Sequence, residues 1–138
     1  MKRRVLILVA CLAGMLFLCV GCGNKYSEVE KLNKEFIELT EEYVADLDKA
    51  DDAKDVAKAI NRYADGMEDL WPKMRAISEK YPELKDRNNP PEELKESQKK
   101  AEEVGIKMAG TMRKVMPYMR DPAVRKAQQR IQAVMTHQ

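Results

Sequence analysis

Cysteine, histidine and aromatic residues are scarce in this chain of 138 residues. Its three cysteines, Cys11, Cys19 and Cys22, lie within the first 22 residues, its single histidine is His137, and aromatic residues make up 6% of the composition. The segment after Cys22 therefore has no pair of thiols for a disulfide and no Cys/His cluster for a zinc site. No serine has a histidine nearby in the sequence to activate it as a nucleophile. The composition gives no indication of an enzyme, and we expect no cofactor.

Positive and negative charges nearly balance, with 25 Lys and Arg against 23 Asp and Glu. Their distribution is uneven, because residues 22–70 contain 7 basic and 14 acidic side chains whereas residues 104–138 contain 7 basic and 1 acidic. A chain without a large positive excess is not drawn to nucleic acid by its overall field. We therefore expect no nucleic-acid partner, and an acidic first part that faces a basic last part within the fold.

The N-terminal segment has the three parts of an export signal. Residues 2–4 are basic, residues 5–18 form an uncharged and mostly apolar run, and residues 19–22 read CVGC. A basic start, an apolar centre and a small residue before the cleavage point are typical of secretory signal peptides. An uncleaved membrane anchor is the alternative, but the 16 residues from Val5 to Val20 are fewer than the roughly 20 that span a bilayer as a helix.

The CVGC sequence resembles the lipobox of bacterial lipoproteins, with Gly21 before Cys22 and with Cys19 where the family usually has Leu. The resemblance implies that residues 1–21 are removed and that Cys22 becomes the lipid-bearing first residue of an exported protein attached to a membrane. In a bacterium with two membranes, Gly23 after the modified cysteine favours the outer membrane, with the domain in the periplasm. The expected organisation is a signal peptide (1–21), a lipid anchor and linker (22–26) and one helical domain (27–138).

Apolar residues recur every three or four positions through most of the region after the linker, which predicts amphipathic helices. Start signals divide this region into four helices. They are a Ser27–Glu30 capping box, Asp51 or Asp52 before the second helix, Asn89–Pro91 for the third and Asp121–Pro122 for the fourth. The expected helices are about 27–49, 52–81, 90–117 (ended by Pro117) and 122–134. The fold class is therefore all-α, an antiparallel four-helix bundle with a short fourth helix.

Pro72 lies inside the second expected helix. The apolar stripe of this helix is the most regular in the chain and continues in phase beyond Pro72: Val56, Ile60, Tyr63, Met67, Leu70, Met74, Ile77 and Tyr81. Proline removes one backbone N–H and clashes with the preceding turn. We expect a kink near Glu68–Trp71 rather than a helix end.

A run of methionines, Met108, Met112, Met116 and Met119, falls at helical spacing on the third helix. Methionine at stripe positions usually fills gaps in a core, and this is the interpretation we prefer. Soft thioethers also bind Cu(I), and an adaptable apolar groove for a partner is a further alternative.

The chain also resembles the periplasmic four-helix cytochromes b, although weakly. The sequence KADD at residues 49–52, followed by Val56, is similar to their first interhelical turn, and His137 matches an axial histidine in position. Ile37 stands where that family has its axial methionine, so the resemblance does not lead us to expect haem. Trp71, beside the kink, is expected to be buried at the edge of the stripe, with a pocket opened by the kink as the alternative.

The sequence thus predicts a lipid-anchored protein of the cell envelope whose helical domain binds a partner or has a structural role, without catalysis. Its expected partners are the membrane, through the N-terminal lipid, and an envelope protein; the oligomeric state stays open. The alternative is a carrier of a small ligand, haem or metal, using the bundle interior near Trp71 and the methionines. Arg125, Lys126 and Arg130 are expected to pair with the acidic first helix, and contact with an anionic surface is the alternative.

Overall fold

The computed structural model describes residues 24–86 and 89–136. Four α-helices account for most of them: α2 (Ser27–Asp48), α3 (Ala53–Lys80), α4 (Lys95–Val115) and α5 (Pro122–Thr136). Three short 3-10 turns connect them: η1 (Pro82–Lys85), η2 (Glu92–Leu94) and η3 (Met116–Tyr118). The described residues contain no strand, so the all-α prediction with four mutually packed helices is confirmed. The predicted signal peptide, Cys22 and His137 lie outside the described residues.

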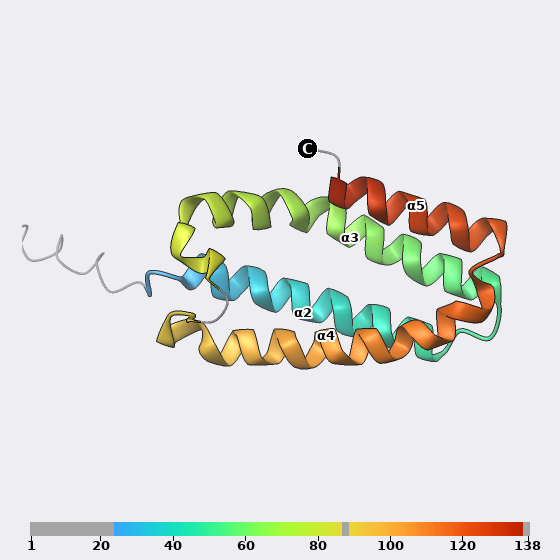
Figure 1. Cartoon of the computed structure of the whole chain (residues 1–138), viewed down its shortest axis with the longest axis horizontal. Helices are drawn as coiled ribbons and strands as arrows, with labels where there is room; N and C mark the ends of the chain where they lie inside the picture. Colours follow the sequence, from blue (N-terminus) through green and yellow to red (C-terminus); the bar gives the residue numbers. More distant parts are fainter. Residues whose placement is uncertain (1–23, 87–88, 137–138) are drawn as a thin grey trace, which may run out of the picture.

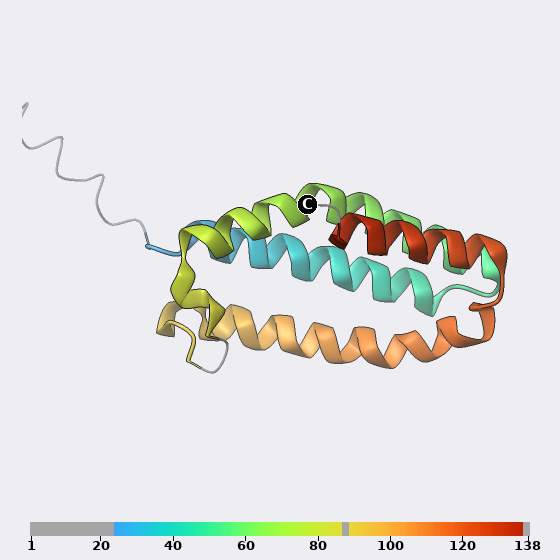
Figure 2. The same cartoon turned by 45° about the horizontal axis from the view of Figure 1, so that its top comes forward.

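The four helices form an open array rather than a closed ring of neighbours (Figures 1 and 2). α2 packs against both α3 and α4, and α5 packs against α3. The expectation that the fourth helix lies beside the first is wrong, because α5 has α3 as its partner. With 15 residues against 28 in α3, α5 is shorter by about 20 Å at 1.5 Å per residue, so it runs along only part of α3.

Two of the expected helix starts are confirmed by side-chain caps. The Asp52 carboxylate accepts a hydrogen bond from the backbone N–H of Asp55 (2.8 Å), and the Asp121 carboxylate accepts one from Ala123 (2.8 Å). Such caps satisfy N–H groups that have no partner in the first helical turn. The capping box at Ser27 does not form, because α2 already includes Ser27 and no side chain caps it.

The third helix also differs from its expected bounds. α4 begins at Lys95, after the η2 turn, rather than at Pro90, and it ends at Val115. The chain around Pro117 continues as the η3 turn, as expected of a proline that ends a helix. α3, in contrast, continues as one helix past Pro72.

The main core lies where α2, α3, α4 and α5 converge. Its buried residues are Tyr43, Leu47, Val56, Ala57, Ala59, Ile60, Tyr63, Met67, Val115, Val124 and Ala127. The Tyr43 and Tyr63 rings stack with centroids 4.6 Å apart, and burial raises the pKa of Tyr43 to about 12. The stripes of the first two predicted helices therefore point to the core as expected.

The methionine run departs from its expected place in the core. Met108 is partly buried against the core, but Met112, Met116 and Met119 are exposed at 39%, 68% and 37%. α4 has α2 as its packing partner, so only the stripe of Val104, Thr111 and Val115 becomes buried. The core interpretation is wrong for three of the four methionines. Met112 lies outside the face of α4 that packs on α2, because a helix with one neighbour buries a narrower face than a helix inside a closed bundle. Met116 and Met119 lie beyond the end of α4, in η3 and directly after it.

Alanine substitutions of the glycines in α4 and in α3 are expected to have opposite effects on the stability of the protein. A Cβ atom at Gly105 or Gly110 would meet no atom within 4 Å, so alanine there should stabilise the protein by about 0.5–1 kcal/mol through helix propensity. At Gly66 a Cβ atom would lie 2.4 Å from Leu39 Cδ1 and 3.1 Å from its Cγ, so Gly66→Ala should destabilise.

Urea unfolding of the three alanine variants, followed by circular dichroism, measures these changes. The double variant Leu39→Ala/Gly66→Ala is the control for the steric cause, because the smaller side chain removes the clash. Gly66→Ala should lower the free energy of unfolding by less in the Leu39→Ala background than in the wild type. A Gly66→Ala variant as stable as Gly105→Ala would show that Leu39 moves aside without cost.

Candidate functional site

The chain is folded almost from its first described residue. Tyr26, placed in the linker by the sequence, is only 6% exposed and belongs to a second buried cluster with Val29, Tyr81 and Leu94. The Tyr26 and Tyr81 rings lie 5.4 Å apart, and the Tyr81 hydroxyl donates a hydrogen bond to the carbonyl oxygen of Lys25 (3.1 Å). Lys25 and Tyr26, which the sequence assigned to the linker, are therefore in contact with the folded body.

Ion pairs attach this first segment to the end of α3 and to η1. Lys25 Nζ donates to Glu83 Oε1 (2.7 Å), and the Tyr26 hydroxyl donates to the same oxygen (3.0 Å). The hydrogen bond from Lys25 is the main cause that lowers the pKa of Glu83 to about 2. Lys80 pairs with Glu28 at 2.7 Å. The charged side chains of these ion pairs are exposed, so the pairs fix the position of the first segment more than they stabilise the fold.

An apolar cleft lies beside this cluster, between α2, α3 and α4. It has a volume of about 230 Å³, and its apolar walls come from Val29, Leu32, Met74, Ile77, Leu84 and Leu94. Asn33, Ser78, Gln98 and the exposed carboxylate of Asp86 add polar groups, and Asn33 Nδ2 donates to Ser97 Oγ (3.1 Å). Mostly apolar walls with a few polar groups are typical of ligand sites.

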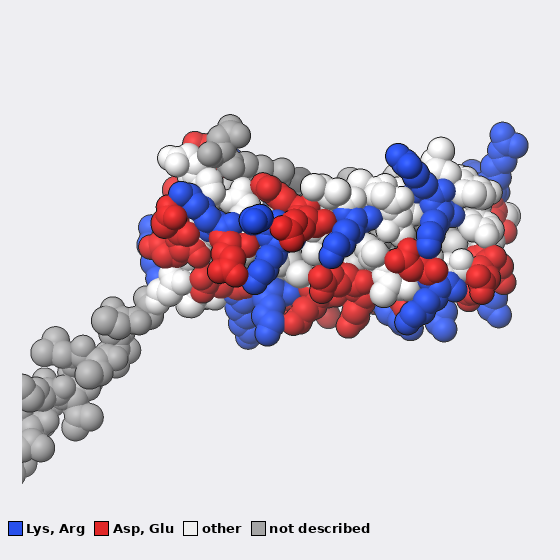
Figure 3. Space-filling view, turned by 90° about the horizontal axis from the view of Figure 1, so that it is seen from below, with Lys and Arg blue, Asp and Glu red and all other residues white. Residues whose placement is uncertain are grey.

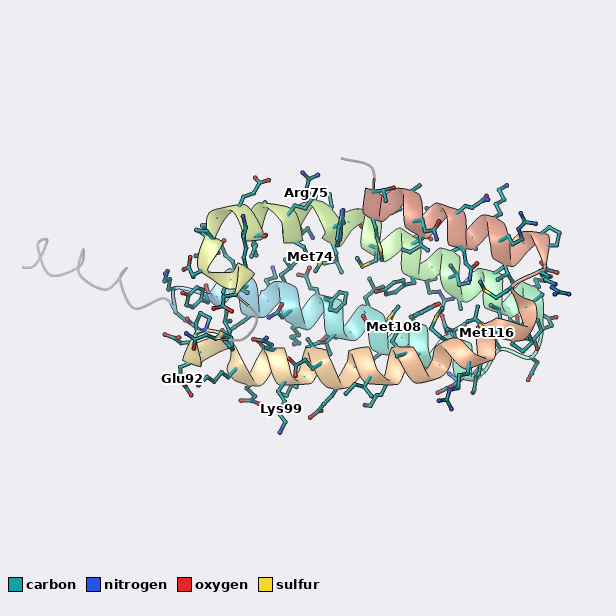
Figure 4. The ribbon with its side chains drawn as sticks, viewed as in Figure 1. Met74, Arg75, Glu92, Lys99, Met108 and Met116 are labelled. Carbon is teal, nitrogen blue, oxygen red and sulfur yellow. The ribbon has the colours of Figure 1, made fainter. Side chains whose placement is uncertain are left out.

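The cleft exists because α3 and α4 both pack on α2 while α5 covers a different part of α3. Figure 4 shows Met74 below α3 and Met108 above α4, both on the sides that face α2. Arg75 and Lys99, on the same two helices, point away from this interior (Figure 4). The helices thus present apolar side chains toward the cleft and their charges to solvent.

The outer surface carries both signs of charge. Over the face seen in Figure 3, Lys and Arg side chains alternate with Asp and Glu along the length of the molecule. Several pairs connect neighbouring helices: Arg62 with Asp46 (2.7 Å), Lys73 with Glu35 (3.7 Å) and Lys114 with Asp48 (2.7 Å). The acidic α2 therefore finds its basic partners on α3 and α4.

The three basic residues predicted for α5 have different environments. Arg130 pairs with Asp65 (2.6 Å) and Glu68 (2.8 Å), both on α3, and these carboxylates raise its pKa. Arg125 and Lys126 are exposed and form no ion pair with any residue of the described ranges. Internal pairing is thus found for Arg130, although with α3 instead of the acidic first helix.

Trp71, where the sequence offered a pocket beside Pro72 as the alternative, is partly buried. It lines a shallow hollow of about 360 Å³ with Glu68, Pro72, Arg130, Ala133 and Val134, where α5 ends beside α3. None of the four methionines of the predicted run lines this hollow, so the structure does not bring Trp71 and those methionines into one pocket.

The sequence could have indicated some of the cleft but not its shape. Met74 and Ile77 were expected at stripe positions of the second helix, whereas Leu84 lay outside any predicted helix. Within residues 24–86 and 89–136, no group of three or more His, Cys, Asp or Glu is arranged to hold a metal ion. No helix in the same ranges is both long and apolar enough to cross a membrane. Comparison with known proteins finds no protein family, no curated protein and no solved structure that matches this chain.

Proposed function

We propose that this chain is an exported lipoprotein of the cell envelope, attached to a membrane through a lipid on Cys22, whose helical domain is a binding module without catalysis. The observation that carries the proposal is the short distance between the CVGC sequence and the folded body. Only three residues lie between Cys22 and the buried Tyr26, and four Cα–Cα steps span at most about 14 Å. A lipid on Cys22 would hold the N-terminal end of the bundle next to the membrane.

The scaffold of this module is proposed to be an antiparallel arrangement with α3 bent at Pro72. Its support is that the connections between successive helices lie at alternate ends of the molecule (Figure 1). Pro72 lacks the N–H that would bond to the Glu68 carbonyl. Figures 1 and 2 show α3 running along two different lines in its two halves. A bend of this kind would keep the second half of α3 apart from α5.

Replacing Cys22 with serine is expected to abolish lipid attachment, because a hydroxyl does not form the thioether to diacylglycerol. The full chain and the variant are expressed in a bacterium with lipoprotein processing, and partition into detergent and the mass of the N-terminal peptide are measured. The wild type should be shortened and lipid-modified, and Cys22→Ser should remain an unmodified precursor.

Cys11→Ser is the matched control, because it removes a thiol from the same N-terminal segment without touching the modification site. It should be processed like the wild type. A Cys22→Ser chain that still has the mature size and enters the detergent phase would refute the lipoprotein proposal.

A carrier of a small apolar ligand is the second candidate, and the cleft at the N-terminal end favours it. This places the ligand near Leu32, Met74 and Leu94 instead of near Trp71. The absorption spectrum of protein purified from its native host tests the haem form of this candidate, since bound haem gives a Soret band.

A further inference from the structure

We propose that the cleft binds one acyl chain of a membrane lipid, taken from the leaflet to which the protein is attached. This inference rests on the proposed attachment through Cys22. It goes beyond that attachment, because it assigns a ligand class to a site in the folded body.

The walls of the cleft match a hydrocarbon chain. Leu32, Met74, Ile77 and Leu94 are apolar and line the space from α2, α3 and the η2 turn. A volume of about 230 Å³ is below the range of pockets that enclose a whole drug-sized molecule, so the cleft suits a segment of one chain and not a lipid with both chains and its headgroup. The unbranched thioether of Met74 adapts its shape to a flexible occupant.

The position of the cleft explains where the chain would come from. The cleft shares Val29 and Leu94 with the buried cluster that contains Tyr26 and Tyr81. The contacts of Lys25 with Glu83 and Tyr81 hold the start of the described chain against this cluster. A lipid on Cys22 would therefore keep Tyr26 within about 14 Å of the anchor and the cleft, which lies beside this cluster, near the bilayer that supplies the acyl chain.

An amphipathic helix from a partner protein is the competing occupant, since it could lie beside α3 in the space left by the short α5. Such a helix normally uses charged residues along the rims of its groove to set its register. Arg75 and Lys99 point away from the cleft (Figure 4), and Asp86 is the single charged residue among those that line it, so the rims lack the series of charges that such a helix would use. The observations therefore favour an acyl chain.

The test uses the full, processed chain reconstituted into vesicles of phosphatidylethanolamine that carries a diazirine near the end of one acyl chain. After irradiation, lipid adducts are located by peptide mass spectrometry. We expect adducts on the residues of α3, η2 and α4 that line the cleft, and none on Arg75 or Lys99, which point away. The lining residues are Met74, Ile77, Ser78, Leu94, Gln98 and Ala101. Ala101→Phe, which fills the cleft from α4, should reduce the adduct yield at least fivefold.

Ala109→Phe is the matched control, because Ala109 is exposed on the same helix and does not line the cleft. It should leave the adducts unchanged. Ser78→Phe is a second filling variant at an exposed edge of the cleft, where the larger ring is easier to accommodate. Ser78→Phe should reduce the adduct yield in the same way as Ala101→Phe, and it replaces Ala101→Phe in the test if that variant does not fold.

Flotation of the vesicles separates the two proposals. A chain that floats with the vesicles but gives no cleft adduct, or gives equal adducts in all variants, overturns the acyl-chain inference and leaves the anchor standing. A wild-type chain that does not float overturns both. In bacterial membranes without the photoreactive lipid, a chain that carries a photoreactive amino acid in place of Ser78 and crosslinks to a protein instead of a lipid would overturn the inference in favour of a partner helix.

Discussion

Replacing Val124 with aspartate is expected to lower the free energy of unfolding by about 3–5 kcal/mol, because it places an unpaired carboxylate in the core. Val124 is fully buried at 0% exposure and belongs to the main core, where α5 packs on α3. No water is available there to solvate the charge. Denaturant unfolding at neutral pH, followed by circular dichroism, measures the loss.

Ala123→Asp is the matched control for this variant. Ala123 is the neighbouring residue but is exposed in the first turn of α5, where an acidic side chain interacts favourably with the helix dipole. Its stability should stay within about 0.5 kcal/mol of the wild type. Equal losses in the two variants would mean that α5 is not packed on α3 as described.

Replacing Met67 with alanine is expected to lower the free energy of unfolding by about 2–5 kcal/mol. The variant buries less apolar surface, and a cavity remains where the side chain was. Met67 is 1% exposed and lies in the main core with Tyr63 and Ile60. Few atoms can move into the space it leaves, because the surrounding helices hold it from several sides. Thermal and urea unfolding should both report the change.

Met116→Ala is the same chemical change at a residue that is 68% exposed in η3. It should alter stability by no more than about 0.5 kcal/mol. The comparison also tests the corrected view of the methionine run. A large loss of stability in Met116→Ala would show that Met116 is buried in the core, as the sequence suggested.

The periodicity of the sequence predicted the buried faces of α2 and α3 well, because these helices have neighbours on more than one side. Val56, Ile60, Tyr63 and Met67 are all buried as their spacing required. On α4 the pattern was less informative, since periodicity shows which side of a helix is apolar and not how many helices cover it. Met112 was expected inside and is exposed.

Thr111 shows a second limit of prediction from apolar periodicity. A threonine on α4 was not expected in the core, yet it is buried at 7% exposure. Its hydroxyl donates a hydrogen bond to the Lys107 carbonyl oxygen (2.9 Å), so the polar atom is satisfied within its own helix. Thr40 does the same with the carbonyl of Phe36 (2.8 Å). Local hydrogen bonds of this kind leave no periodic signal in the sequence.

The cleft could not be predicted, because it depends on how far apart α3 and α4 lie on α2. Its residues are spread over three helices and the connection between α3 and α4. For Trp71 the expectation was burial at the edge of the stripe, and a pocket opened by the kink at Pro72 was the alternative. The cleft begins about one turn beyond Trp71, along residues 74–78 of α3, where α5 does not reach.

The division of the interior into two buried clusters has a mechanical consequence. A pull on the N-terminus enters the fold at Lys25 and Tyr26, which are attached to Glu83 and Tyr81, and so acts first on the small cluster at that end. The main core contains none of these residues. Under such a load the small cluster opens before the main core, because segments with fewer buried contacts unfold at lower free energy. A membrane-anchored chain built in this way would yield next to its anchor and keep the distal part of the bundle intact.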